Sequence, residues 1–155
     1  MHSKNLWERG DGYEVNLSVV SNFLGSLQYR PGGSGNYETG GYLLGQCNLK
    51  TNTIHVIDTI EAPEDTVHMG DYLVLGKKGV RKKLSQIERL SGATFGYVGE
   101  WHSHPNGPNW FSVVNFEEFA NKAEEMRTEV ATRPILEVLV SPVGLRCAVL
   151  ALGED

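Results

Sequence analysis

The chain has 155 residues, about the length of one domain, and we expect residues 1–155 to form a single domain. Hydrophobic residues make up 40% of it, which excludes the apolar-poor composition of a disordered protein. The net charge is -5, from 19 acidic and 14 basic residues, and this argues against non-specific nucleic-acid binding, which needs a basic face.

No apolar stretch is long enough to cross a membrane, and residues 1–15 contain no apolar segment typical of a signal peptide. We therefore expect a cytoplasmic protein that does not associate with membranes. The two cysteines, Cys47 and Cys147, fall in strand-like segments and lack CxxC spacing. We expect both to be small buried apolar side chains.

The first half of the chain predicts one helix and two strands. Apolar residues at helical spacing predict a helix over residues 16–29, which the glycine-rich loop RPGGSGN ends. Residues 37–49 (YETGGYLLGQCNL) predict a strand, and its glycines suggest a close approach of neighbouring backbone. The alternating, β-branched segment 53–60 predicts a hairpin partner for that strand, whereas residues 61–76 predict an irregular crossing.

The second half begins with a predicted basic helix over residues 79–92, which has Gly92 as its C-cap. Residues 93–105 (ATFGYVGEWHSHP) predict a strand that leads into a pair of histidines. A third helix is predicted over residues 113–130, and residues 134–152 predict a final hairpin. This order gives a mixed central sheet flanked by about three helices, so we predict an α+β fold close to the α/β class.

The two histidines of this strand, His102 and His104, carry the main chemical signal. Residues i and i+2 of a strand point to the same face, so both imidazoles can reach one point. Neutral imidazole suits zinc, and a catalytic zinc site has three protein ligands and one open position. An HxH pair alone is a weak signal, because such a pair is more often a structural or exposed feature.

We expect a third metal ligand from the helix that follows. Ser112 is a good N-cap, and Asn115 lies in the first turn, so a helix that starts beside the metal brings position 115 close to the histidines. A carboxylate there would complete a His-His-Asp site, but Asn115 offers only a neutral oxygen, a weaker zinc ligand. Asn115 could equally be an ordinary polar residue of a helical turn. Ser112 could cap the helix, donate a hydrogen bond to an oxyanion, or do both.

A metal hydrolase also needs a base that takes a proton from water and passes it to the leaving nitrogen. Glu38 is one candidate, because it begins an apolar, glycine-rich strand, where an acidic side chain is not expected without a functional role. Glu100 is the other, because it shares a strand face with both histidines; it could also orient an imidazole. Spacing alone does not choose between the two acids, and Glu38 could be a simple strand-end carboxylate.

Together these residues resemble the JAMM (MPN) metalloprotease family. The residues that match are Glu38 within ETGGYLLG, the run His102-Ser103-His104-Pro105, and Ser112 at the expected spacing. The resemblance covers about residues 37–116 and implies a single compact MPN-type domain. The phrase GYVGEWHSHP looks most like small stand-alone bacterial members, some of which sit beside ubiquitin-like conjugation components in anti-phage defence operons.

The resemblance implies a zinc-dependent, deubiquitinase-like isopeptidase or peptidase that cleaves after the C-terminal tail of a ubiquitin-like protein. It implies that His102 and His104 bind Zn²⁺, that Glu38 rather than Glu100 is the general base, and that Ser112 helps to hold the oxyanion. Asn115 stands where the family has its aspartate metal ligand, which implies impaired activity in this chain.

Three explanations of Asn115 stay open: an engineered Asp-to-Asn change that traps a substrate or product, a natural change that weakens metal binding, and a natural pseudo-enzyme. We favour the first, because every other catalytic position is intact. Two alternative functions also stay open. One is the trimming of a sulfur-carrier protein's C-terminus, and the other is an inactive module that binds or scaffolds a ubiquitin-like partner. We expect substrate contacts from residues 61–76 and from the turn at 106–110.

Overall fold

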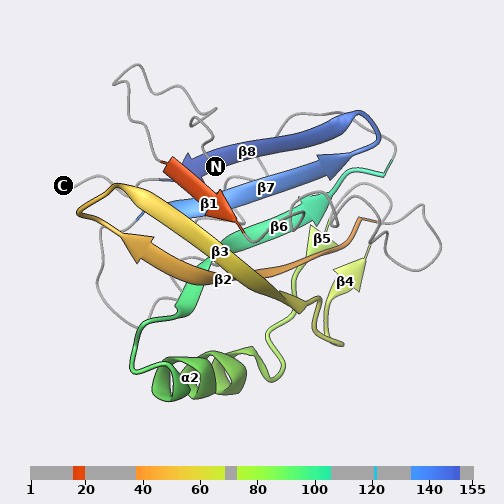
Figure 1. Cartoon of the computed structure of the whole chain (residues 1–155). Helices are drawn as coiled ribbons and strands as arrows, with labels where there is room; N and C mark the ends of the chain where they lie inside the picture. Colours follow the sequence, from red (N-terminus) through yellow and green to blue (C-terminus); the bar gives the residue numbers. More distant parts are fainter. Residues whose placement is uncertain (1–15, 20–37, 69–72, 106–120, 122–133, 151–155) are drawn as a thin grey trace.

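The computed structural model describes residues 16–19, 38–68, 73–105, 121 and 134–150. Among them, a mixed six-stranded sheet has the order β1-β3-β2-β6-β7-β8 (Figure 1). The strands are β1 (Asn16–Val19), β2 (Gly40–Asn48), β3 (Thr53–Glu61), β6 (Gly96–Ser103), β7 (Ile135–Ser141) and β8 (Gly144–Leu150). Two pairs, β1 with β3 and β6 with β7, are parallel, and the other neighbours are antiparallel.

The predicted hairpins are confirmed. Strands β2 and β3 pair antiparallel, as do β7 and β8. The expected close approach of backbone is also present, since a Cβ added at Gly40 would overlap the carbonyl oxygen of Trp101 on the adjacent β6. The segment that we expected to be an irregular crossing contains a small separate sheet, β4 (Val67–His68) and β5 (Leu73–Val74).

Within the described residues there is one helix, α2 (Val80–Leu90), rather than the three expected. The prediction of a helix over 16–29 is wrong at residues 16–19, which form strand β1; residues 20–29 lie outside the described part. Of the helix expected over 113–130, Asn121 alone is described, and it is helical. No helix in the described ranges is long and apolar enough to span a membrane.

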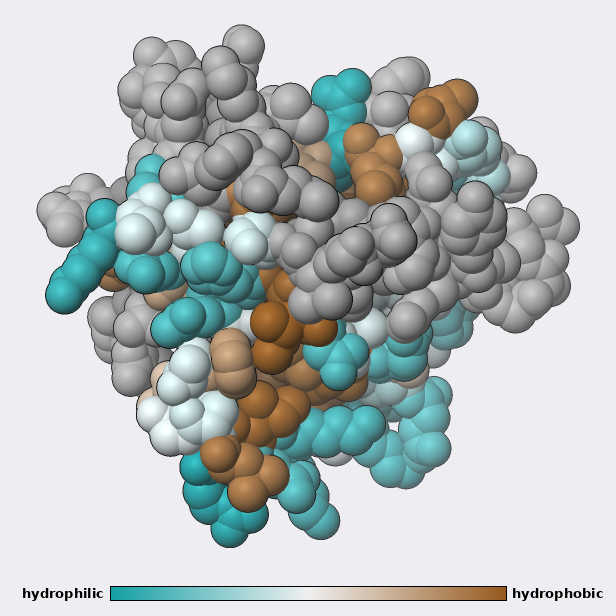
Figure 2. Space-filling model, viewed as in Figure 1, coloured by the Kyte–Doolittle hydropathy of each residue, from teal (hydrophilic) through white to brown (hydrophobic). Residues whose placement is uncertain are grey.

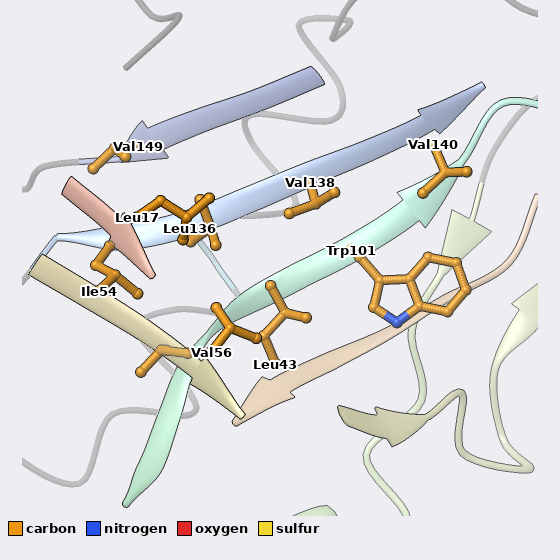
Figure 3. Close-up of a cluster of buried hydrophobic side chains, with 10 residues drawn as sticks. Leu17, Leu43, Ile54, Val56, Trp101, Leu136, Val138, Val140 and Val149 are labelled. Carbon is orange, nitrogen blue, oxygen red and sulfur yellow. The ribbon is translucent and has the colours of Figure 1, made fainter. Parts of the chain in front are cut away.

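One face of the sheet carries an apolar core to which all six strands contribute (Figure 3). Its members are Leu17, Leu43, Ile54, Val56, Val98, Trp101, Leu136, Val138, Val140 and Val149. The expected apolar role of the cysteines is confirmed in part, because Cys47 and Cys147 pack against this core but are only partly buried. Burial raises the pKa of the Cys147 thiol to about 11.

Helix α2 packs against a second apolar cluster that contains Tyr42, Leu44 and Ile60. Val80 and Leu84 are the buried residues of the helix, one turn apart, and its basic residues remain exposed. The helix ends as the sequence predicts, because Gly92 adopts a left-handed conformation with φ of 62° just past its last turn. On the face drawn in Figure 2, hydrophobic residues form a band in the lower half that hydrophilic residues border.

A bulge in β6 determines which of its residues face each cluster. Leu43 of β2 pairs with Gly99 and Leu44 pairs with Tyr97, so Val98 is the extra residue. Val98 and Trp101 consequently both join the core of Figure 3, although they are three residues apart. A side chain at Gly99 is excluded, because its Cβ would overlap the carbonyl oxygen of Leu136 on β7.

Candidate functional site

The end of β6 and the start of β2 are joined by main-chain and side-chain hydrogen bonds. The Ser103 N–H donates to the Thr39 carbonyl oxygen at 2.8 Å, and the Thr39 N–H donates to the Ser103 hydroxyl oxygen at 3.0 Å. On the other side, the His104 N–H donates to the carbonyl oxygen of Val140 on β7 at 2.8 Å. These bonds fix the backbone of the histidine run between two neighbouring strands and hold Glu38 beside it.

Glu38, His102 and His104 meet at this point, and all three side chains are buried. The Oε1 atom of Glu38 lies 3.6 Å from Nε2 of His104. The rings of His102 and His104 have centroids 4.9 Å apart and are inclined at 74°, so they do not stack in parallel. The structure thus brings together the acid and the two imidazoles that the sequence singles out, although Glu38 is more than 60 residues away.

The small sheet approaches the same acid through its backbone. Nδ1 of His68, on β4, lies 2.9 Å from the carbonyl oxygen of Glu38, a geometry in which the ring N–H donates. His68 therefore positions the main chain of Glu38, while the carboxylate of the same residue faces His104. This contact lies within the 61–76 segment that we expect to contact substrate.

A second group of polar residues lies behind the histidines, on the same sheet face. Glu100 and Glu137 are opposite each other in the parallel pairing of β6 with β7, and both are buried. The hydroxyl of Tyr97 donates to Oε1 of Glu100 at 3.4 Å. Oε2 of Glu137 is 4.0 Å from Nδ1 of His102. Glu100 thus points into an interior polar group, which also contains an acid that sequence reasoning missed.

Burial is the main electrostatic influence on this group. It raises the pKa of Glu137 well above its ordinary value, and the negative charge of Glu100 raises it further. Burial also raises the pKa of Tyr97, with Glu100 and Glu137 as the next contributors. The signal that could have found Glu137 is its position as the single charged residue in the apolar segment ILEVLVS.

The remaining predicted residues, Ser112 and Asn115, lie outside the described part of the chain, as does the turn at 106–110. Among residues 16–19, 38–68, 73–105, 121 and 134–150, no group of three or more His, Cys, Asp or Glu side chains is placed to hold a metal ion. The chemistry of the donors that are described does fit zinc: two imidazoles lie side by side, with a carboxylate against one of them. The two imidazoles would supply two of the three protein ligands that a catalytic zinc site needs.

Comparison with known proteins identifies the family. A search of curated proteins found no match. Among solved structures, the chain is similar to the solution structure of protein DSY2949 from Desulfitobacterium hafniense, with 13% sequence identity and a TM-score of 0.54. That match covers 90% of this chain and 86% of the other, and at this identity it supports the fold alone. Residues 34–134 match the family model for prokaryotic homologues of the JAB domain. The chain, a mixed α+β domain of the MPN type, therefore belongs to the prokaryotic JAB-domain family.

Proposed function

We propose that the protein is a zinc-dependent peptidase or isopeptidase that hydrolyses the bond after the C-terminal tail of a ubiquitin-like protein. The observation that carries this proposal is the convergence of Glu38, His102 and His104, all buried, at the junction of β2 and β6. Buried ionisable groups are costly, so three of them at one point need a common reason. Membership of the JAB-domain family supports the same chemistry.

In this proposal His102 and His104 would hold the zinc ion, with residue 115 as the third ligand. A bound zinc ion supplies Lewis acidity toward the scissile carbonyl and lowers the pKa of a water molecule. Glu38 takes a proton from the attacking water and delivers it to the leaving nitrogen. Ser112 donates a hydrogen bond to the oxyanion. Asn115 weakens metal binding, because a neutral amide oxygen replaces a carboxylate.

The substrate is an extended tail that adds to a strand edge by main-chain hydrogen bonds. The β4–β5 sheet offers such an edge beside the site, since His68 of β4 contacts the Glu38 backbone. We place the reaction in the cytoplasm, the compartment that keeps cysteines such as Cys47 and Cys147 in the reduced form. The association with anti-phage conjugation systems rests on the sequence resemblance alone.

Asn115 also favours one alternative, an inactive module that binds a ubiquitin-like partner without cutting it. The two functions make opposite predictions for the variant Asn115→Asp. A catalytic ancestry predicts that this variant gains zinc affinity and cleavage, whereas a binding module gains neither. Trimming of a sulfur-carrier protein uses the same chemistry and differs only in substrate.

The test measures zinc content by elemental analysis, and cleavage of ubiquitin that carries a C-terminal peptide extension, for the chain and for Asn115→Asp. We expect the variant to hold stoichiometric zinc and to release the extension. Adding Glu38→Ala should abolish cleavage and leave zinc bound. Absence of both zinc and cleavage in Asn115→Asp would contradict the proposed function. Retained turnover after Glu38→Ala would identify another base, Glu100 first.

A further inference from the structure

Glu137 is a buried acidic residue that the proposed reaction does not use. It lies in the middle of β7, where every residue from Ile135 to Ser141 is buried, and its own exposed fraction is 1%. Removing an ionised carboxylate from water is unfavourable unless partners in the interior compensate for the lost hydration. An acid at this position therefore needs a role that an apolar residue of β7 could not fill.

Three polar groups surround Glu137: the carboxyl group of Glu100, the phenol of Tyr97 and a ring nitrogen of His102. Glu100 lies opposite it on β6, and Tyr97 donates to Glu100. Within the described residues, the neighbouring Glu100 carboxyl group is the one side chain that shares a hydrogen bond with the Glu137 carboxyl group, and no nitrogen donor lies at hydrogen-bond distance from it. The ring nitrogen Nδ1 of His102 lies 4.0 Å from Oε2, about 1 Å beyond a hydrogen bond. The imidazole N–H of His102 is thus the nitrogen donor that a small ring movement brings to this carboxylate.

We propose that Glu137 is a positioning residue: it accepts a hydrogen bond from Nδ1–H of His102 and so leaves Nε2 of that ring as the metal-binding nitrogen. This inference rests on the proposed function, because it assigns a role at the same metal site. A histidine that binds a metal through one nitrogen commonly donates the other N–H to a carboxylate, which fixes its tautomer and orientation. The acid comes from β7 and acts through the ring of His102.

Geometry favours Glu137 over Glu100 for this role. Glu100 is two residues before His102 on the same strand, and its Oε1 accepts from the Tyr97 hydroxyl. Glu137 approaches from the neighbouring strand, two residues before Leu139, which is opposite His102 in the register. Its carboxylate therefore reaches the His102 ring from the side, and the ion-pair distance is to Nδ1.

The experiment compares three substitutions on β7. Glu137→Met keeps the volume and removes the acceptor, and Glu137→Gln keeps an acceptor oxygen without the charge. Leu139→Met is the matched control, because it alters packing opposite His102 without a polar change. If Glu137→Met does not fold, Glu137→Asp replaces it with the same expectations, since it withdraws the carboxylate by one methylene.

The first readout needs no metal. Long-range ¹⁵N–¹H spectra of the metal-free protein report which ring nitrogen of each histidine carries the proton, and a His102→Gln spectrum assigns the signals of His102. We expect the Nδ1–H form in the parent chain, Glu137→Gln and Leu139→Met, and a shift toward the Nε2–H form in Glu137→Met. An unchanged tautomer in Glu137→Met would overturn the inference.

The second readout is the zinc dissociation constant of each variant, in the chain as it stands and with Asn115→Asp. We expect Glu137→Met to raise it about 10- to 100-fold, and the two other variants to change it less than about threefold. Equal losses in Glu137→Met and Leu139→Met would reassign the effect to packing and overturn the inference. If neither parent binds zinc, the proposed function fails, and the tautomer result alone then decides the role of Glu137.

Discussion

The pair of strands β6 and β7 has an apolar face and a face that carries ionisable side chains. Toward the core of Figure 3 they direct Val98, Trp101 and three residues of β7, all apolar. On the opposite face the same two strands carry Glu100, His102 and Glu137, which are buried to the same degree. The difference between the faces therefore lies in the kind of side chain and not in its access to water.

This comparison shows how a small domain keeps ionisable groups in its interior. Burying large apolar side chains contributes roughly 1.5–3 kcal/mol each, whereas burying an ion costs several kcal/mol unless it is paired. The apolar face, to which all six strands contribute, can stabilise the register of β6 and β7. The polar face can then carry groups that would destabilise a strand pair on its own.

The largest expected effect on stability comes from a substitution at the β6 bulge, which determines the face of the sheet to which each β6 side chain points. Gly99→Ala should lower the free energy of unfolding by about 3 kcal/mol or more, because its Cβ overlaps the Leu136 backbone and disturbs the β6–β7 pairing. Urea unfolding measures the effect. Gly96→Ala in the same strand is the control: its Cβ meets the flexible side chain of Glu88 at 3.3 Å, so a change below about 1 kcal/mol is expected. Similar losses at both glycines would contradict the role given to the bulge.

Adjacent residues of β7 sharpen the comparison, because Val138 belongs to the apolar core and Glu137 to the opposite face. Val138→Thr should cost about 1–3 kcal/mol, since it places a hydroxyl in an apolar environment. Glu137→Gln should instead stabilise the fold at pH 7, because it removes a carboxyl group whose ionisation the interior opposes.

The pH dependence of the Glu137 effect follows from the raised pKa of its carboxyl group. The folded protein keeps a proton that the unfolded chain releases above the ordinary carboxyl pKa, so the stability contributed by Glu137 is complete below that value and is lost as pH rises toward the folded pKa. The gain from Glu137→Gln should accordingly be absent at pH 4 and grow toward pH 8. Urea unfolding across this range checks it; a gain of equal size at both ends would contradict the explanation.

The smallest effect is expected at Cys147, on the apolar face. Its folded pKa of about 11 exceeds the ordinary value of 9.0, so the stability that the neutral thiol contributes is complete below pH 9 and is lost as pH rises through 11. The Cys147→Ala variant has no thiol to ionise, so its stability does not fall for this reason as the pH rises. The unfolding free energies of the two proteins should therefore converge by about 1–2 kcal/mol between pH 9 and 11. Curves that stay parallel across that range would contradict this account.

Local patterns predicted the elements that carry strong periodicity. The alternating segment at 53–60 became β3, and the basic helix over 79–92 became α2. The helical spacing over residues 16–29 failed at residues 16–19, because the strand conformation there depends on parallel pairing with β3, which the local pattern does not specify. The two-residue strands β4 and β5 have no periodicity to read.

The sequence predicted the parts of the site that lie on a single strand. It did not predict the contacts that depend on how distant strands pair. Alternation along β6 placed Glu100 and His102 on one face, as expected. The approach of Glu137 to His102 depends on the parallel register of β7 against β6, which no local pattern specifies. The choice of Glu38 over Glu100 as the base came from the family resemblance and stays a prediction; in the structure its Oε1 lies 3.6 Å from Nε2 of His104.

The hydrogen bond between His68 and the Glu38 carbonyl gives the small sheet a mechanical link to the site. Strand β4 binds the main-chain carbonyl group of Glu38, and this hydrogen bond does not involve the Glu38 carboxylate. A ligand that displaces β4 would thus pull the main chain of Glu38 and change the reach of its carboxylate. Binding of a ligand at β4 would in this way act on the site by moving the Glu38 backbone. It would require no change in protonation and no movement of the histidines.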